Sequence, residues 1–227
     1  MPPRFFIHAG FHKTGTTTLQ ILLRKNKALL QNHAQILLRE DMLRVCTAAR
    51  GYSNTKSALD LGMVHYEFAE LLERLPEAPQ EFILSSEDLA GYMPGRKNVE
   101  NYGATPDLMK ALADTILALH PTADITFFFT TRAAAPWLRS CYTQHLKAVR
   151  MTLSEEAYIR NFAPSANLDQ IVEAVRASVP EARVDSIALE TAGPDRLGPL
   201  DTLFSLGNIP QEVVAQIAPI AVANTAP

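Results

Sequence analysis

The sequence predicts an α/β fold of three layers, in which a central, mostly parallel β-sheet is flanked by helices. Short apolar runs alternate with amphipathic stretches along the 227 residues, and this order of elements is typical of a parallel sheet covered by helices. The apolar run at residues 125–130 suits a central strand that is buried on both faces. Because the sequence contains neither a repeat nor a linker, we expect a single domain over residues 1–227.

The individual elements follow from local signals. Further strands are expected at 4–8, 81–85 and 184–189, and helices at 16–32, 57–75, 105–120, 136–150, 154 onward, 167–178 and 197–206. Thr105-Pro106-Asp107 is a typical helix start, with Thr as N-cap, Pro in the first turn and an acid at the positive helix end. The segment 91–103 contains three Gly and predicts the longest loop, a candidate lid or substrate loop.

Composition and charge narrow the possible functions. The chain has 21 Lys and Arg against 24 Asp and Glu, and 47% of its residues are hydrophobic, as in ordinary globular proteins. The first 60 residues hold nine basic and three acidic side chains, a balance of +6, which favours a local anionic ligand over a nucleic-acid surface. No segment has the length of an apolar membrane span. The two cysteines lie far apart in the sequence and indicate no disulfide framework, so we expect a cytoplasmic protein. No Cys or His spacing indicates a metal site, so no metal is expected.

The most informative segment is residues 7–20, which lies between an expected strand and an expected helix. Gly10 and Gly15 stand five residues apart, like the two glycines of a P-loop. A nucleotide triphosphatase has Lys-Ser/Thr after the second glycine, whereas here Thr16 and Thr17 follow and Lys13 lies inside the loop. Backbone N–H groups and the positive helix end can hold an anion there. A threonine-rich N-cap is the purely structural alternative.

Residues 10–20 resemble the 5′-phosphosulfate loop of P-loop-fold sulfotransferases that use 3′-phosphoadenosine 5′-phosphosulfate (PAPS), particularly the bacterial and glycosaminoglycan-modifying branch. The resemblance implies that the loop contacts the 5′-phosphate and the transferring sulfuryl group, and that Lys13 stabilises the charge on the bridging oxygen. It requires no metal. The residues that it assigns to cofactor binding here are Lys13, Thr14, Gly15, Thr16, Thr17 and Thr18.

Two further segments resemble the same family. Arg132 follows the 125–130 strand and Ser140 comes eight residues later, the spacing with which the family binds the 3′-phosphate of PAPS. Ser85-Ser86-Glu87 follows the strand at 81–85 and resembles the segment whose glutamate is the proposed catalytic base, so Glu87 is implied as the base. A strand-end salt bridge, a helix-surface serine and a helix-capping acid are the structural alternatives for Arg132, Ser140 and Glu87.

The resemblance thus implies a sulfotransferase that moves a sulfuryl group from PAPS to a hydroxyl or amine of a saccharide, lipid or small molecule. His12 is open between contact with the acceptor or a phosphate, an orienting role and solvent exposure. His145 and Lys147 are open between acceptor contact and solvent exposure. The basic, glycine-containing loop that many relatives carry near the C-terminus is lacking, and only Arg183 and Arg196 could replace it. A P-loop kinase with ATP and Mg²⁺, and a catalytically silent nucleotide-binding protein, are the alternative functions. The acceptor and the oligomeric state are not readable.

Overall fold

The computed structural model describes residues 2–76, 81–97, 99–148, 151–207 and 209–220 and has the expected α/β architecture. Its sheet has the strand order β2-β3-β1-β4-β5, with every neighbouring pair parallel. The strands are β1 (Arg4–His8), β2 (Gln35–Leu38), β3 (Glu81–Ser85), β4 (Asp124–Thr131) and β5 (Arg183–Ala188). Parallel strands end at the same edge, so the loops after them converge there.

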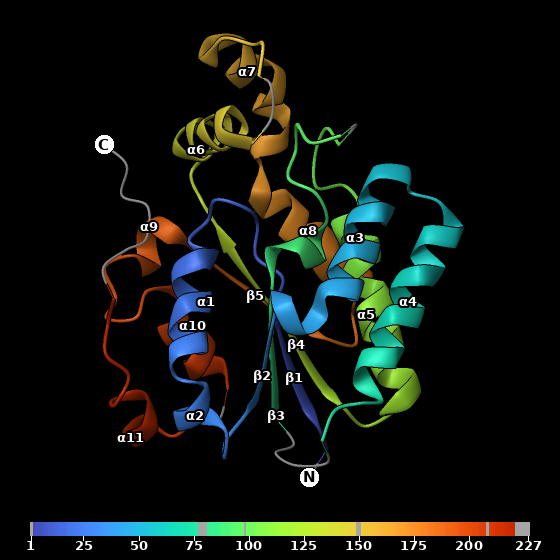
Figure 1. Ribbon diagram of the computed structural model, residues 1–227, viewed down its shortest axis with the longest axis vertical. Coiled ribbons are helices and arrows are strands. Elements are labelled where there is room, and N and C mark those ends of the chain that lie inside the picture. Colours follow the sequence, from blue (N-terminus) through green and yellow to red (C-terminus); the bar gives the residue numbers. More distant parts are fainter. Residues whose placement is uncertain (1, 77–80, 98, 149–150, 208, 221–227) are drawn as a thin grey trace.

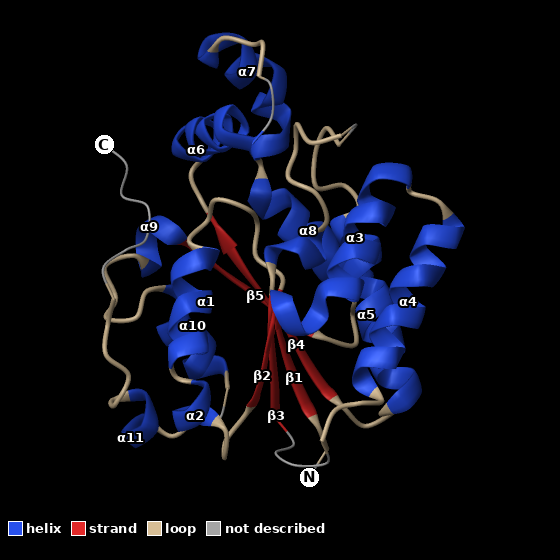
Figure 2. Cartoon of the chain, in the orientation of Figure 1, coloured by secondary structure: helices blue, strands red, loops and turns tan. Residues whose placement is uncertain are grey.

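Helices cover both faces of this sheet (Figures 1 and 2). One layer holds α1 (Thr16–Lys25), α2 (Lys27–Leu30), α9 (Leu189–Ala192), α10 (Pro199–Leu206) and α11 (Gln211–Val214). The other holds α3 (Leu43–Thr55), α4 (Ala58–Leu72), α5 (Thr105–Leu119) and α8 (Leu168–Ser178). Beyond the carboxyl ends of the strands lie α6 (Ala134–Ala148) and α7 (Glu155–Phe162), and the short 3-10 helices are η1 (Arg39–Met42), η2 (Glu87–Ala90) and η3 (Ala163–Ala166).

The apolar strands explain why two separate cores form. Successive side chains of a strand point to opposite faces of the sheet. Phe127 and Phe129 of β4 therefore pack into the core beneath α3, α5 and α8, whereas Phe128 packs into the core beneath α1 and α10. Phe6 of β1 joins the Phe128 side, and its neighbours Phe5 and Ile7 join the other. The run 125–130 is thus buried on both faces, as expected.

The structure departs from the expected elements mainly in the first quarter of the chain. The helix predicted at 16–32 is broken at Asn26, whose side-chain amide donates a hydrogen bond to the Leu22 carbonyl at 2.8 Å and ends α1. Neither β2 nor α3 was predicted, because β2 has only four residues and polar segments flank it. Thr105 is the first residue of α5 rather than its N-cap, which is Ala104. The end predicted for α6 near residue 150 lies outside the described residues.

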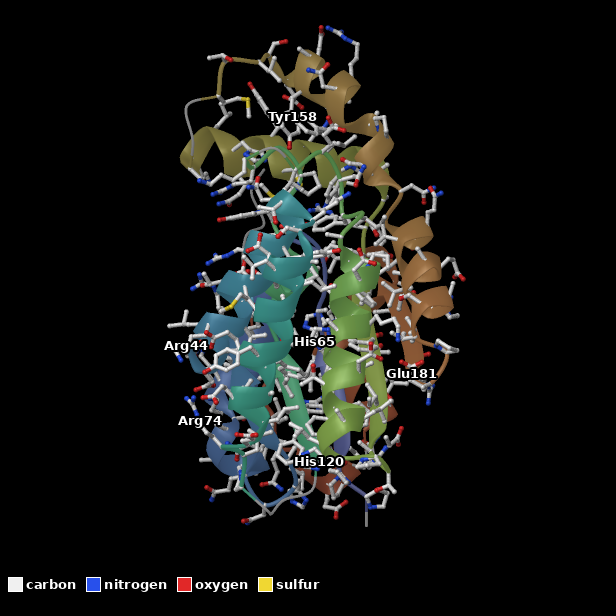
Figure 3. All side chains as sticks on the ribbon, turned by 90° about the vertical axis from the view of Figure 1, so that its right-hand side faces the viewer. Arg44, His65, Arg74, His120, Tyr158 and Glu181 are labelled. Carbon is white, nitrogen blue, oxygen red and sulfur yellow. The ribbon has the colours of Figure 1, made fainter. Side chains whose placement is uncertain are left out.

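Figure 3 shows the layer of α3, α4, α5 and α8 from outside, with His65 between α4 and α5. The Nδ1 atom of His65 lies 2.9 Å from the Thr115 hydroxyl, so this histidine joins two helices of the layer. No helix within the described ranges combines the length and the apolar character that crossing a bilayer requires.

Candidate active site

A cavity of about 710 Å³ opens where the loops after the strands converge. Its volume lies in the range of small-molecule sites. The loop after β1, the end of β3 and the end of β4 all contribute to its walls. Of the nine residues that the sequence singled out, eight line it: Lys13, Gly15, Thr16, Thr17, Thr18, Glu87, Arg132 and Ser140.

The loop between β1 and α1 has the backbone geometry of an anion-binding turn. Lys13 and Gly15 both have positive φ, 69° and 93°. Gly15 is the N-cap of α1 and no side chain caps this end, so the positive end of the helix faces the cavity. Gly10 is required by close packing: a Cβ atom there would lie 2.7 Å from His8 Nε2 and 2.8 Å from Thr16 Cγ2.

Thr14 is the one predicted site residue whose side chain does not reach the cavity. It is fully buried, and its hydroxyl donates to the Phe11 carbonyl at 2.6 Å and lies 2.7 Å from the Thr130 hydroxyl. These bonds tie the turn to β4. Its hydroxyl therefore shapes the loop, and only its backbone remains for a direct contact with an anion.

Arg132 and Ser140 reach the same cavity from β4 and α6. The Arg132 guanidinium donates to the Lys13 carbonyl at 3.2 Å, so it points toward the loop and not to a carboxylate at the strand end. Lys13 in turn points its ammonium at Gln144 of α6, 3.5 Å away. Burial lowers the pKa of Lys13, and the positive charges of Lys147 and Arg132 add to this effect. The cavity therefore concentrates positive charge around the loop.

Glu87 lies at the carboxyl end of β3, with its side chain on the cavity wall. The structural alternative, a capping role, belongs to Ser86, whose hydroxyl accepts from the Asp88 backbone N–H at 3.3 Å. Glu87 instead accepts a hydrogen bond from the Gln20 amide of α1 at 2.7 Å. The Oε2 atom of Glu87 is thus bound to α1, the helix that follows the anion-binding turn.

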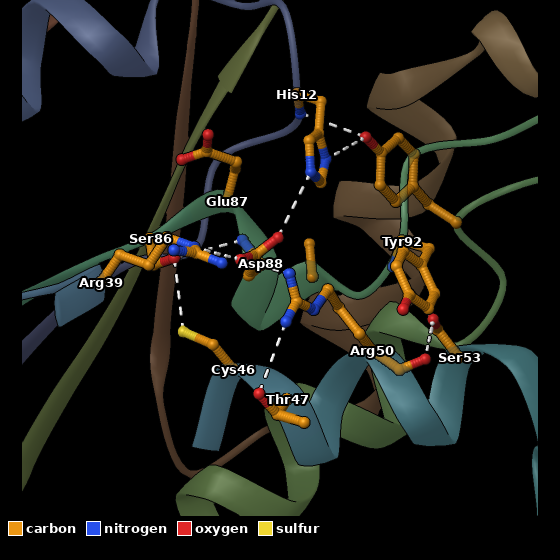
Figure 4. Close-up of polar contacts among 12 residues, drawn as sticks. His12, Arg39, Cys46, Thr47, Arg50, Ser53, Ser86, Glu87, Asp88 and Tyr92 are labelled. Atoms are coloured by element: carbon orange, nitrogen blue, oxygen red, sulfur yellow. Dashed lines mark hydrogen bonds and ion pairs between the residues drawn. The ribbon is translucent and has the colours of Figure 1, made fainter. Parts of the chain in front are cut away.

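Asp88 contacts three side chains that the sequence had not brought together, Arg39, Arg50 and His12 (Figure 4). Its Oδ2 atom accepts from Arg39 Nε at 2.6 Å and from Arg50 Nη1 at 3.2 Å, and its Oδ1 atom lies 3.6 Å from His12 Nε2. Burial disfavours the charged carboxylate, but the bonds from His12 and Arg39 outweigh it and lower the pKa of Asp88 to about 2. With both oxygens engaged, Asp88 is a poor magnesium ligand, which weakens the kinase alternative.

His12 is held from both sides of its ring. Its backbone N–H donates to the Tyr102 oxygen at 3.1 Å, and its Nδ1 atom lies 2.9 Å from the same oxygen. Burial raises the pKa of Tyr102 well above its ordinary value, so this hydroxyl stays protonated and can donate a hydrogen bond to Nδ1. The Nε2 atom then carries the proton that faces Asp88.

Of the other residues left open by the sequence, His145, Lys147 and Arg183 do not line the cavity. His145 is fully buried with Nε2 at 3.0 Å from the Pro94 carbonyl, so neither expectation for it holds, and Lys147 is exposed. Arg183 pairs with Asp185 on β5. Arg196 lines the cavity, but its guanidinium donates to the carbonyls of Val214 and Ile217. Neither arginine thus provides a free basic loop.

Sequence reasoning missed Arg39, Arg50 and Arg96, which also line the cavity. A signal existed for the first two, since both belong to the basic first 60 residues that favoured an anionic ligand. Arg39 follows β2 directly, as Arg132 follows β4, but β2 was not recognised. Within the described ranges, no three His, Cys, Asp or Glu side chains gather as metal ligands would.

Comparisons with known proteins give a structural match. No protein-family model matches the chain, and no curated protein sequence does. Among solved structures, it is similar to a sulfotransferase from Alicyclobacillus acidocaldarius, with a TM-score of 0.52 and 16% sequence identity over 100% of this chain and 87% of that one. At this identity the likeness concerns architecture. The chain therefore has the α/β fold of a sulfotransferase, with a five-stranded parallel sheet between two layers of helices.

Proposed function

We propose that the protein is a sulfotransferase that uses PAPS as its sulfuryl donor. The observation that carries the proposal is that one cavity holds three elements: the anion-binding turn after β1, the Arg132 and Ser140 pair, and the Glu87 carboxylate. The turn suits the 5′-phosphosulfate, and an arginine with a nearby hydroxyl suits the 3′-phosphate. The sulfotransferase fold of the chain supports this assignment.

The donor would supply an activated sulfuryl group whose S–O bond to the 5′-phosphate breaks during transfer. Around that bond, the N–H groups at the start of α1 and the ammonium of Lys13 would neutralise charge that develops on the phosphate oxygen. The ammonium is already aimed across the cavity toward Gln144. Side chains in fixed positions lower the barrier because they need not reorganise during the reaction.

Glu87 would accept the proton of the acceptor. Its Oε2 atom is bound to Gln20, and its position at the end of β3 is next to β1, the strand that carries the donor loop. As the acceptor oxygen or nitrogen forms its bond to sulfur, its proton passes to the Glu87 carboxylate. The reaction then yields a sulfated acceptor and 3′,5′-adenosine bisphosphate.

Calorimetric titration with 3′,5′-adenosine bisphosphate and adenosine 5′-phosphate tests the donor site. We expect the bisphosphate to bind at least tenfold more tightly, and Arg132→Gln to abolish this preference while retaining weak adenosine 5′-phosphate binding. Arg139→Gln is the matched control, because Arg139 lies close by on α6, next to Ser140, but its side chain is 71% exposed and does not line the cavity. Equal binding of both nucleotides by the wild-type protein would refute the donor assignment.

Transfer itself is measured with ³⁵S-labelled PAPS and a panel of saccharide, phenol and amine acceptors. Loss of a general base typically costs 10²–10⁴-fold in rate. We therefore expect Glu87→Gln to transfer at least about 100-fold more slowly while binding the bisphosphate like the wild type. Magnesium-dependent ATP turnover in place of sulfuryl transfer would instead establish the kinase alternative.

A catalytically silent nucleotide-binding protein is the second candidate. The observation in its favour is that the Arg196 guanidinium donates to backbone carbonyls and Arg183 pairs with Asp185. Neither arginine therefore offers a free cation to a bound nucleotide. Tight bisphosphate binding without label transfer to any acceptor would support this candidate. Label transfer to any acceptor, lost in Glu87→Gln, would exclude it.

A further inference from the structure

We infer that the acceptor carries an anionic group, a carboxylate or a sulfate, which is bound by an arginine wall formed by Arg39, Arg50 and Arg96. The inference rests on the proposed function, since it concerns the acceptor half of the same cavity. All three arginines line that cavity, and none of them belongs to the segments assigned to the donor.

The order of the sheet separates Arg39, one member of the arginine wall, from Arg132 on the proposed donor side. Arg39 follows β2, Glu87 follows β3, the anion-binding turn follows β1 and Arg132 follows β4. Because β2, β3, β1 and β4 are neighbours in that order, Arg39 and Arg132 lie on opposite flanks of the turn. Glu87 lies on the Arg39 flank, so a group held by the wall is next to the proposed base.

The wall carries more positive charge than its one anchoring carboxylate can neutralise. Asp88 contacts Arg39 through Nε and Arg50 through Nη1. The two terminal nitrogens of Arg39 make no hydrogen bond to the part of the chain that the structure describes, and Arg50 Nε is buried without a partner there. The guanidinium of Arg96, from the segment 91–103, likewise has no ion pair or hydrogen bond within the described ranges. Asp88 thus contacts two of the three guanidinium groups, and Glu87 is a second carboxylate that acts on Arg39 through its charge. The three positive charges of the wall still exceed these two negative charges.

Two members of the wall, Arg39 and Arg50, are also held in place before any ligand arrives. Arg50 lies over the Tyr92 ring, 5.6 Å from its centroid, and its Nη2 atom donates to the Thr47 hydroxyl at 3.4 Å. Arg39 is fixed by its bond to Asp88, as Figure 4 shows. A fixed guanidinium offers paired N–H donors that match the two oxygens of a carboxylate or sulfate. The wall therefore suits recognition of such a group better than a diffuse surface charge would.

Two sugar derivatives that differ at one group provide the test. The probes are 4-nitrophenyl β-D-glucuronide, with a carboxylate, and 4-nitrophenyl β-D-glucoside, with a hydroxymethyl group in its place. Each is titrated into protein saturated with 3′,5′-adenosine bisphosphate, which fills the donor side. We expect the glucuronide to bind at least tenfold more tightly than the glucoside.

Variants identify the residues responsible. Arg96→Gln should reduce the preference for the glucuronide about tenfold, because Arg96 lines the cavity and has no structural partner to lose. Arg44→Gln is the control, since Arg44 is exposed and lies outside this cavity, and it should leave the preference unchanged. Folding of both variants is checked by their bisphosphate affinity.

The outcomes separate this inference from the proposed function. If the protein binds the bisphosphate but binds the two sugars equally, or binds no glucuronide, the inference is wrong and the donor site stands. An Arg96→Gln variant that keeps the full preference also refutes the role of the wall. If the bisphosphate itself does not bind, the proposed function fails and this inference fails with it.

Discussion

Replacement of Asp88 by Asn tests whether one buried carboxylate organises the side of the cavity that Arg39 and Arg50 line. The side chain of Asp88 is 9% exposed and contacts His12, Arg39 and Arg50. These contacts lower its pKa from an ordinary 3.8 to about 2. At about 1.4 kcal/mol per pH unit, that difference corresponds to roughly 2–3 kcal/mol of folding stability at pH 7. Asp88→Asn keeps the shape and removes the charge, so we expect a loss of about this size.

The stabilisation by the Asp88 carboxylate should depend on pH. A carboxylate whose pKa is lowered by folding stabilises the protein above the unfolded pKa, near 4, and loses this effect as the pH falls through about 2. The stability difference between wild type and Asp88→Asn should therefore be largest at neutral pH and shrink below pH 4. Urea unfolding followed by circular dichroism at pH 7, 5 and 3.5 measures it.

A matched control separates the buried anchor from ordinary surface pairs. Asp114→Asn removes a carboxylate that pairs with Lys110 on the exposed face of α5, and we expect it to change stability by less than about 1 kcal/mol. If Asp88→Asn is no more destabilising than Asp114→Asn at pH 7, or its effect does not depend on pH, Asp88 does not organise the cluster.

Three further predictions concern the end of β1 and the anion-binding turn that follows it. Gly10→Ala places a methyl group against His8 and Thr16 and should cost about 1–3 kcal/mol of stability, measured by urea unfolding, whereas an unchanged midpoint would contradict the packing described. Burial lowers the pKa of His8 to about 3, so the folded protein does not bind the proton that this histidine takes up below about pH 6.5 in the unfolded chain. The free energy of unfolding should therefore fall by about 1.4 kcal/mol between pH 7.5 and 5.5. If His8→Asn leaves this pH dependence unchanged, the prediction is wrong. Thr14→Val should lower stability by about 1–2 kcal/mol, because the hydrogen bonds to the Thr130 hydroxyl and the Phe11 carbonyl are lost. The affinity for the bisphosphate, measured by calorimetry, should stay within threefold of the wild type. A loss of affinity beyond tenfold would place the Thr14 hydroxyl at the ligand.

The sequence singled out those residues of the cavity wall that local spacing makes recognisable. The turn at 10–18 is recognisable because its glycines, lysine and threonines lie within one short segment between a strand and a helix. Arg132 and Glu87 could be placed because each directly follows a strongly apolar strand. Parallel strands end at one edge, and this geometry brings such residues together.

The arginine wall escaped prediction for the opposite reason. Arg39, Arg50 and Arg96 lie on three different elements, and their proximity depends on β2, a strand of four residues. Asp88 gave no signal of its own, because sequence alone does not reveal that Arg39 and Arg50 both contact one oxygen of its carboxylate. Thr14 was grouped with its neighbours, although only the packing against β4 decides that its hydroxyl points inward.

The hydrogen bond from Arg132 to the Lys13 carbonyl joins two ends of the cavity that lie 119 positions apart in the chain. A shift of the backbone at Lys13 moves the acceptor of that bond, and a shift of the guanidinium pulls on the turn. Occupancy at one end and order at the other are therefore thermodynamically linked, and linkage works equally in both directions. An inhibitor fragment that fills one end would pre-order the other, so two weak fragments should bind more tightly together than their separate affinities suggest.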